Sequence, residues 1–73
     1  MSFPVCLNLS RRLQLAAMLA LLSHTEIVRR CQCPLETIQH AQAGGELDIW
    51  DFDSLCDAID AWDAGQEVKR GEA

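Results

Sequence analysis

The sequence has few residues that break regular structure, and it lacks a glycine-rich phosphate-binding loop. Four glycines and two prolines occur among 73 residues, whereas 49% of the residues are hydrophobic. This composition argues against a disordered chain and favours a folded helical protein. At this length the chain forms one small domain whose core is too thin to enclose a large cavity.

Catalytic and metal-binding patterns are also missing. His24 and His40 have no nucleophile near them in the sequence. The spacing of Cys31 and Cys33 is too short for a structural zinc site, which favours two to four intervening residues. We therefore predict a protein that is not an enzyme and has no cofactor or metal. Its four cysteines are interpreted as reduced thiols that serve as small core residues, with a solvent-facing Cys33 left open.

No run of apolar residues is long enough to cross a membrane. The longest candidate, residues 13–22, is interrupted by Gln14 and is too short for a membrane span. Arg11 and Arg12 precede it, as in a signal peptide, but no small-residue cleavage site follows. We expect a buried helix here and a cytoplasmic protein.

Basic residues are absent from the segment 46–63, and the charge of the chain is uneven as a result. Residues 1–45 contain four arginines and two glutamates, a net charge of +2. Residues 46–73 contain nine acidic residues against one lysine and one arginine, a net charge of −7. The second part of the chain is therefore suited to a basic partner.

The remaining patterns predict an all-α domain of four to five helices. Asn8 or Ser10 can cap a first helix that ends near Leu22. Its apolar residues cover more than one stripe, so this helix is either sandwiched in the core or also contributes to a dimer contact. A second helix is expected at about Thr25–Gln32, with Ile27, Val28 and Cys31 facing inward.

Proline and glycine mark the limits of the later helices. Pro34 suits the first turn of a third helix, which should stop at Gly44 and Gly45. A last helix is expected at about 54–64, capped by Asp51 or Asp53 and ended by Gly65. The predicted organisation is a single domain at 1–64 and a flexible tail at 65–73.

Two short helices joined by a sharp turn at residues 32–34 form a helix-turn-helix pattern. Residues 22–62 resemble the Cro/C1-type (lambda-repressor-like) helix-turn-helix family. Leu22–Ile27 matches the start of the family's second helix. Ile38 and Ala41 match apolar positions of its recognition helix, and Gly44 matches the glycine that ends it. The resemblance implies a helix-turn-helix core and a role in transcription.

Three residues depart from the family pattern. Val28 replaces a small alanine, and Pro34 replaces the Ser or Thr that would cap the helix and contact phosphate. Gln32 replaces a glycine at a left-handed turn, which costs about 1 kcal/mol if that conformation is kept. These changes leave the fold possible and weigh against DNA binding.

A DNA-binding role would use the outward side of the third helix. Gln39 would pair with adenine and Glu36 with cytosine, and Arg29 and Arg30 would hold phosphates. The residues assigned to this alternative are Arg29, Arg30, Leu35, Glu36, Gln39 and His40. The third helix itself contains no Lys or Arg.

Acidic and aromatic residues alternate after the third helix and predict a protein-binding surface. Asp53, Asp57 and Asp60 follow the i, i+4, i+7 spacing of one helix face. Trp50 and Phe52 are too large for both to be buried in so small a core, and tryptophan is a frequent interface anchor. A face that only aids solubility is the simpler interpretation. The predicted surface comprises Asp48, Trp50, Asp51, Phe52, Asp53, Asp57 and Asp60.

These features favour a compact transcription regulator, of the kind that bacteriophages encode, that binds host RNA polymerase through this acidic and aromatic surface. The alternative is a Cro/C1-like repressor that binds an operator duplex. A second alternative is an antitoxin-like or DNA-mimic inhibitor of another protein. A monomer and a homodimer both remain open, and no membrane partner is expected.

Overall fold

The computed structural model describes the backbone of residues 5–72 and the side chains of residues 5–65. Four helices follow one another: α1 (Leu9–Leu21), α2 (His24–Cys31), α3 (Leu35–Gln42) and α4 (Ile49–Glu72). The prediction of an all-α fold is confirmed. Between residues 5 and 72 the extended pairing is limited to one antiparallel bridge, in which Val5 and Leu47 exchange backbone hydrogen bonds of 2.9 and 2.7 Å.

Polar side chains cap the first two helices, at Asn8 as the sequence predicted and at Ser23. The side chain of Asn8 accepts a 2.9 Å hydrogen bond from the backbone N–H of Arg11 at the start of α1. Ser23 caps α2 by accepting a hydrogen bond from the N–H of Glu26. Each bond satisfies one of the backbone donors that a helix start leaves without a partner.

A left-handed residue makes the turn between α2 and α3. Gln32 has a φ of 55°, the only positive φ of a non-glycine residue in the described part of the chain. Its backbone N–H donates to the carbonyl of Val28 and so closes α2. Pro34 then occupies the position just before α3, one residue earlier than predicted. The turn therefore keeps the conformation of a helix-turn-helix without the glycine that favours it.

Gly44 ends α3 as expected, with a φ of 92°. The guanidinium of Arg12 lies beside it and donates a 3.0 Å hydrogen bond to the carbonyl of Gln42. A cation at this position is favourable because the last carbonyls of a helix carry partial negative charge. Arg12 thus ties α1 to the end of α3.

The predicted limits of the last helix are wrong at both ends. The helix starts at Ile49 rather than Ser54, because the carboxylate of Asp48 accepts a 2.9 Å hydrogen bond from the N–H of Asp51 and caps the chain there. Gly65 does not end it: α4 continues to Glu72. A glycine within a helix costs only about 1 kcal/mol, so it weakens the helix without forcing an end. The segment predicted as a tail therefore begins inside α4.

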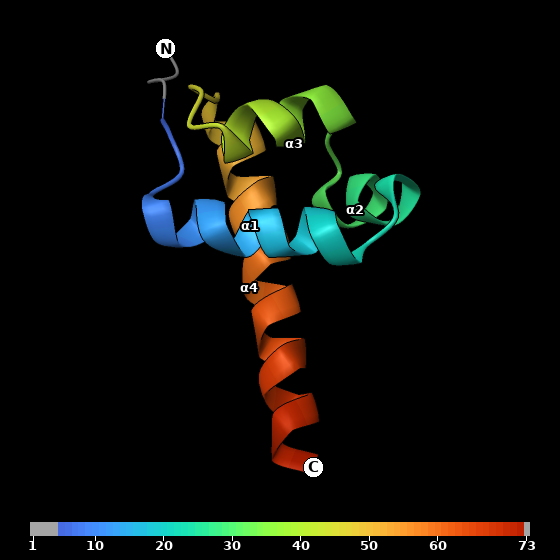
Figure 1. Ribbon diagram of the computed structural model, residues 1–73. Helices are drawn as coiled ribbons and strands as arrows, with labels where there is room; N and C mark the ends of the chain where they lie inside the picture. The colour runs from blue at the N-terminus through green and yellow to red at the C-terminus, as the bar shows by residue number, and fades with distance from the viewer. Residues whose placement is uncertain (1–4, 73) are drawn as a thin grey trace.

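The core lies where α1, α2 and α3 meet the first part of α4. Figure 1 shows α1 lying across α4, with α3 near the start of α4 and the later turns of α4 projecting away from the other helices. Among residues 5–65, twelve apolar side chains are buried: Leu7, Leu15, Met18, Ile27, Cys31, Cys33, Ile38, Ala41, Leu47, Leu55, Ala58 and Ile59. Full burial of a Leu or Ile side chain contributes about 1.5–3 kcal/mol. These contacts hold both α3 and α4 against α1 and α2.

Candidate functional site

The side chains predicted to contact DNA occupy two helices, and most of them are exposed. Arg29 and Arg30 lie on α2, and Glu36, Gln39 and His40 lie on α3, all of them accessible to solvent. Leu35, the remaining residue of this set, is only partly exposed, and its side chain packs against the core. The α2–α3 unit is thus arranged as a helix-turn-helix with a polar outer side.

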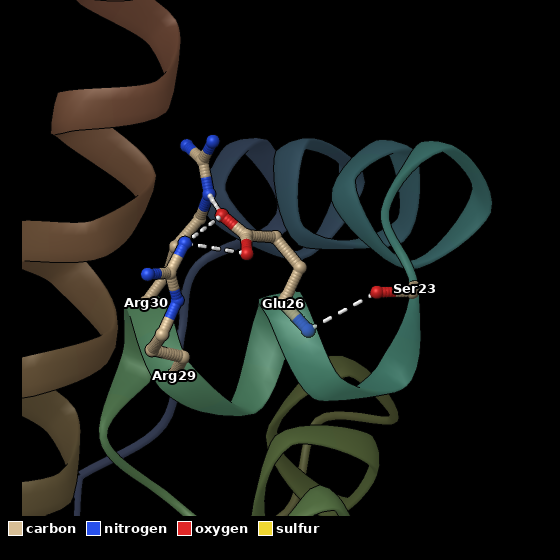
Figure 2. A network of polar contacts seen from close by, with 4 residues as sticks. All are labelled: Ser23, Glu26, Arg29 and Arg30. Atoms are coloured by element: carbon tan, nitrogen blue, oxygen red, sulfur yellow. Dashed lines mark hydrogen bonds and ion pairs between the residues drawn. The ribbon is translucent and has the colours of Figure 1, made fainter.

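One glutamate binds both arginines of α2. Figure 2 shows the carboxylate of Glu26 between the two guanidinium groups. It accepts hydrogen bonds of 2.6 and 2.9 Å from Arg29 and one of 2.9 Å from Arg30. These bonds lower the pKa of Glu26 below its ordinary value, and the bond from Arg30 has the largest effect. A phosphate that approached α2 would have to compete with this carboxylate.

Four carboxylates gather beside the outer side of α3. A hollow of about 410 Å³ is lined by Glu36, Thr37, His40, Glu46, Leu47, Asp48 and Asp51. We call it the acidic hollow. Its wall combines α3, the loop after α3 and the first turn of α4. The side of the helix that would enter a DNA groove therefore shares a concave surface with negative charges from elsewhere in the chain.

The loop wall of the acidic hollow is held by contacts with α3. The Nε2 atom of His40 lies 3.0 Å from the carbonyl oxygen of Glu46. Gly45 passes so close to the His40 ring that an added Cβ atom would lie 2.2 Å from it. An added Cβ would displace the exposed His40 ring, so the glycine at position 45 lets this ring lie against the loop.

The predicted protein-binding residues are divided between two places. Asp48 and Asp51 belong to the acidic hollow. Trp50, which is 79% exposed, lies instead with the exposed residues Asp53, Asp57 and Asp60 on the side of α4 that faces away from the core. We call these four residues the α4 outer face. Phe52 belongs to neither, because it is half-buried and packs against the core.

Two arginines lie near the α4 outer face. Arg11 forms a 2.9 Å ion pair with Asp60, whose side chain remains 64% exposed. Arg30 and Asp57 line the same small hollow of about 210 Å³ between the end of α2 and α4. Exposed ion pairs contribute about 0–1 kcal/mol, so the pairing hardly strengthens the fold. It does place a basic side chain beside the Asp60 end of this face.

Two of the four cysteines, Cys31 and Cys33, belong to the interior. The prediction that all four are core residues is wrong, because Cys6 is exposed and Cys56 is half-buried. Cys31 and Cys33 are buried, which excludes the solvent-facing Cys33 that the sequence left open. Burial raises the pKa of the Cys31 thiol to about 11. Burial also raises the pKa of Cys33, and the nearby Asp51, whose Oδ1 lies 3.8 Å from its sulfur, adds to this effect. Both thiols are thus held in the protonated, unreactive form.

Sequence reasoning missed the acidic hollow because its parts are distant in the chain. Glu36 was assigned to DNA contact, and Glu46 was counted only as part of an acidic segment. Nothing in their spacing shows that they share a surface. The pairing of Glu26 with both arginines, by contrast, was readable from its i+3 and i+4 spacing.

Comparison with protein-family models, curated proteins and solved structures gives no match for this chain. Among the described residues, no helix combines the length and the apolar character needed to cross a membrane. Those residues also contain no group of three or more His, Cys, Asp or Glu side chains placed to hold a metal ion.

Proposed function

We propose that this chain is a cytoplasmic transcription regulator that uses a helix-turn-helix scaffold to bind a basic protein surface. The acidic hollow is the observation that carries the proposal. Its carboxylates, Glu36, Glu46, Asp48 and Asp51, lie beside the outer side of α3. Phosphate contacts supply much of the affinity of DNA-binding proteins, and these carboxylates would repel the phosphates.

The α4 outer face supplies the second part of the proposed binding site. Trp50 offers a large apolar ring to a partner, while Asp53 and Asp57 carry the charge that draws a basic surface toward it. Tryptophan is among the residues that dominate binding energy at interfaces. Complementary charge mainly raises the rate of encounter and the specificity. The two features together suit a partner rich in Lys and Arg.

RNA polymerase is the partner to test first. This choice rests on the resemblance of residues 22–62 to transcription regulators and on the acidic charge of α4. An antitoxin-like or DNA-mimic inhibitor would use the same surface on another basic protein. Binding to polymerase separates these two possibilities.

The test compares variants of equal net charge for binding to purified RNA polymerase on an immobilised surface. The first variant combines Asp53→Asn, Asp57→Asn and Asp60→Asn. The control places three lysines at positions away from α4: Ser10→Lys, Thr25→Lys and Ala43→Lys. We expect the first to weaken binding at least tenfold, a loss of about 1.4 kcal/mol or more, and the control to bind nearly as the unchanged chain does. Equal losses in both variants, or no binding by the unchanged chain, would contradict the proposal.

A Cro/C1-like repressor remains the second candidate because Gln39, Arg29 and Arg30 are exposed on the α2–α3 unit. A chemical-shift titration with random duplex DNA at low salt distinguishes it. We expect α3 to show no shifts. Shifts at α2 and α3 that fade as salt rises would favour the repressor, and Gln39→Ala should then lose operator discrimination while keeping non-specific affinity.

A further inference from the structure

Helix α1 has a second apolar face that the described residues leave exposed. Its inner side carries Leu15 and Met18, which are fully buried against the other helices. On its opposite side Leu9 is 66% exposed and Leu13 is 63% exposed. Three of the five large apolar side chains exposed in the described part of the chain lie on this helix, the third being Leu21. An apolar surface of this kind on a small domain usually marks an interaction site.

The residues of this face follow the spacing of a helix–helix seam; Leu9, Leu13 and Ala20 are exposed, and Ala16 is partly exposed. Leu9, Leu13, Ala16 and Ala20 are separated by four, three and four residues. At 100° per residue these positions fall within an arc of about 60°. The same 4–3–4 spacing brings a and d residues of coiled coils onto one line. The face is therefore shaped to receive another helix along its length.

The distribution of charge favours a second copy of this chain over a charged partner. The seam itself carries no ionisable side chain. The two arginines of α1 are engaged inside the domain, Arg11 with Asp60 and Arg12 with the carbonyl of Gln42. Two copies that meet through α1 would also keep their acidic α4 helices apart, because each α4 packs against the inner side of its own α1, as Figure 1 shows.

We propose that this face binds the same face of a second copy, with the two α1 helices antiparallel about a two-fold axis. In this direction Leu9 lies opposite the second copy's Ala20, and Leu13 lies opposite its Ala16. Every layer then pairs a large side chain with a small one, so the helices can approach closely. A parallel pair would place leucine on leucine at one end and alanine on alanine at the other, leaving a gap. An isologous contact of this kind closes as a dimer.

The size of the face sets the expected strength of the dimer. A helix of 13 residues, the length of α1, is about 20 Å long. One such helix offers less than the roughly 800 Å² per partner that specific, stable interfaces bury. The contact therefore belongs to the weak class, in which monomer and dimer exchange and the dimer fraction rises with protein concentration.

Sedimentation velocity over a wide concentration series tests the proposal with the full chain. We expect the unchanged chain to shift from monomer to dimer. Leu13→Glu should move the midpoint to at least about tenfold higher concentration, because the dimer would bury an unpaired carboxylate. Gln39→Glu, which adds the same charge to the exposed side of α3, should leave the midpoint unchanged. Circular dichroism at low concentration checks that both variants stay folded.

Mixing two variants tests the direction of the helices. Ala16→Lys alone should also weaken the dimer, since it places an ammonium group opposite Leu13. An equimolar mixture of Leu13→Glu and Ala16→Lys should associate more strongly than either variant alone, because the new carboxylate of one copy then faces the new ammonium group of the other. A monomer at every concentration, or a midpoint unchanged by Leu13→Glu, would overturn the proposal. If the mixture associates no more strongly than either variant alone, the antiparallel arrangement is overturned.

Discussion

The exposed sides of α2 and α4 carry opposite charges, and they differ in how those charges are balanced. Arg29 and Arg30 on α2 share one carboxylate, that of Glu26, within their own helix. The carboxylates of α4 receive less compensation: Asp60 pairs with Arg11 across the domain, while Asp48 accepts a backbone N–H as a helix cap. The charge of α2 is therefore partly compensated within its own helix, whereas α4 receives its compensation from Arg11 of α1.

The arrangement of the helices and the charge of their exposed sides depend on different residues. The α2–α3 unit keeps the left-handed turn at Gln32 and the buried Ile38 that its geometry requires. Those residues hold the helices together whatever the surface carries. The charged residues around them then decide which partner the same geometry can approach.

Removing part of the shared core should break both surfaces together. Ile38 is fully buried between the helices, so Ile38→Ala should lower the free energy of unfolding by about 2–5 kcal/mol. Urea denaturation followed by circular dichroism measures this loss. Gln39→Ala, one residue away but exposed, should stay within about 0.5 kcal/mol of the unchanged chain. Similar losses for the two substitutions would mean that α3 is not anchored through Ile38.

A glycine in the turn should strengthen the α2–α3 unit without changing any charged residue. Gln32 has a φ of 55°, a conformation that glycine adopts more easily than any other residue. Gln32→Gly should therefore raise the free energy of unfolding by about 1 kcal/mol, measured by urea denaturation. Gln32→Ala keeps the Cβ atom and serves as the control, for which no gain is expected. If both variants were equally stable, the left-handed conformation would carry no strain.

Protonation of Glu26 at low pH should break its ion pairs with Arg29 and Arg30. Of the changes considered, this one should alter the free energy of unfolding least. The pKa of Glu26 is lowered by its bonds with Arg30 and Arg29. A carboxyl group whose folded pKa is depressed stabilises the fold above its unfolded pKa, and this contribution is lost as the pH falls through the folded pKa. Because the pair is exposed to solvent, the change in stability should be slight.

The pKa of Glu26 can be followed by NMR titration of the carboxyl carbons. Arg30→Ala should raise it toward the ordinary value of 4.5, and by more than Arg29→Ala does. Arg12→Ala, whose side chain bonds to Gln42 instead, should leave it unchanged. If the pKa of Glu26 were the same in Arg30→Ala and Arg29→Ala as in the unchanged chain, the two arginines would not be bound to Glu26 in solution. The contrast between α2 and α4 would then be lost.

Local features of the fold could be predicted from the sequence because their causes lie within a few residues. The cap at Asn8 and the stop at Gly44 each depend on a single residue type at a helix end, whereas the left-handed turn at Gln32 was expected only from the family resemblance. The start of α4 was misplaced because several aspartates can cap a helix. Only the position of the loop after α3 selects Asp48 among them.

The candidate site was harder to predict because it depends on which distant residues meet. The spacing of Asp53, Asp57 and Asp60 did place them on one exposed side of a helix. Trp50 and Phe52 have similar neighbours in the sequence, yet one is exposed and the other packs against the core. Their difference follows from the orientation of α4, which is set by contacts with α1 and α2. The acidic hollow depends on the same arrangement.

The bridge between Val5 and Leu47 determines which end of the chain is suited to a purification tag or a label. Leu47 lines the acidic hollow, and its backbone is bound to Val5. A basic purification tag or fluorophore on the N-terminal side would be tethered through Val5, which is paired with the wall of the acidic hollow, and would compete for the proposed binding surface. The far end of α4 projects away from the other helices in Figure 1. Labels for binding experiments therefore belong at the C-terminus.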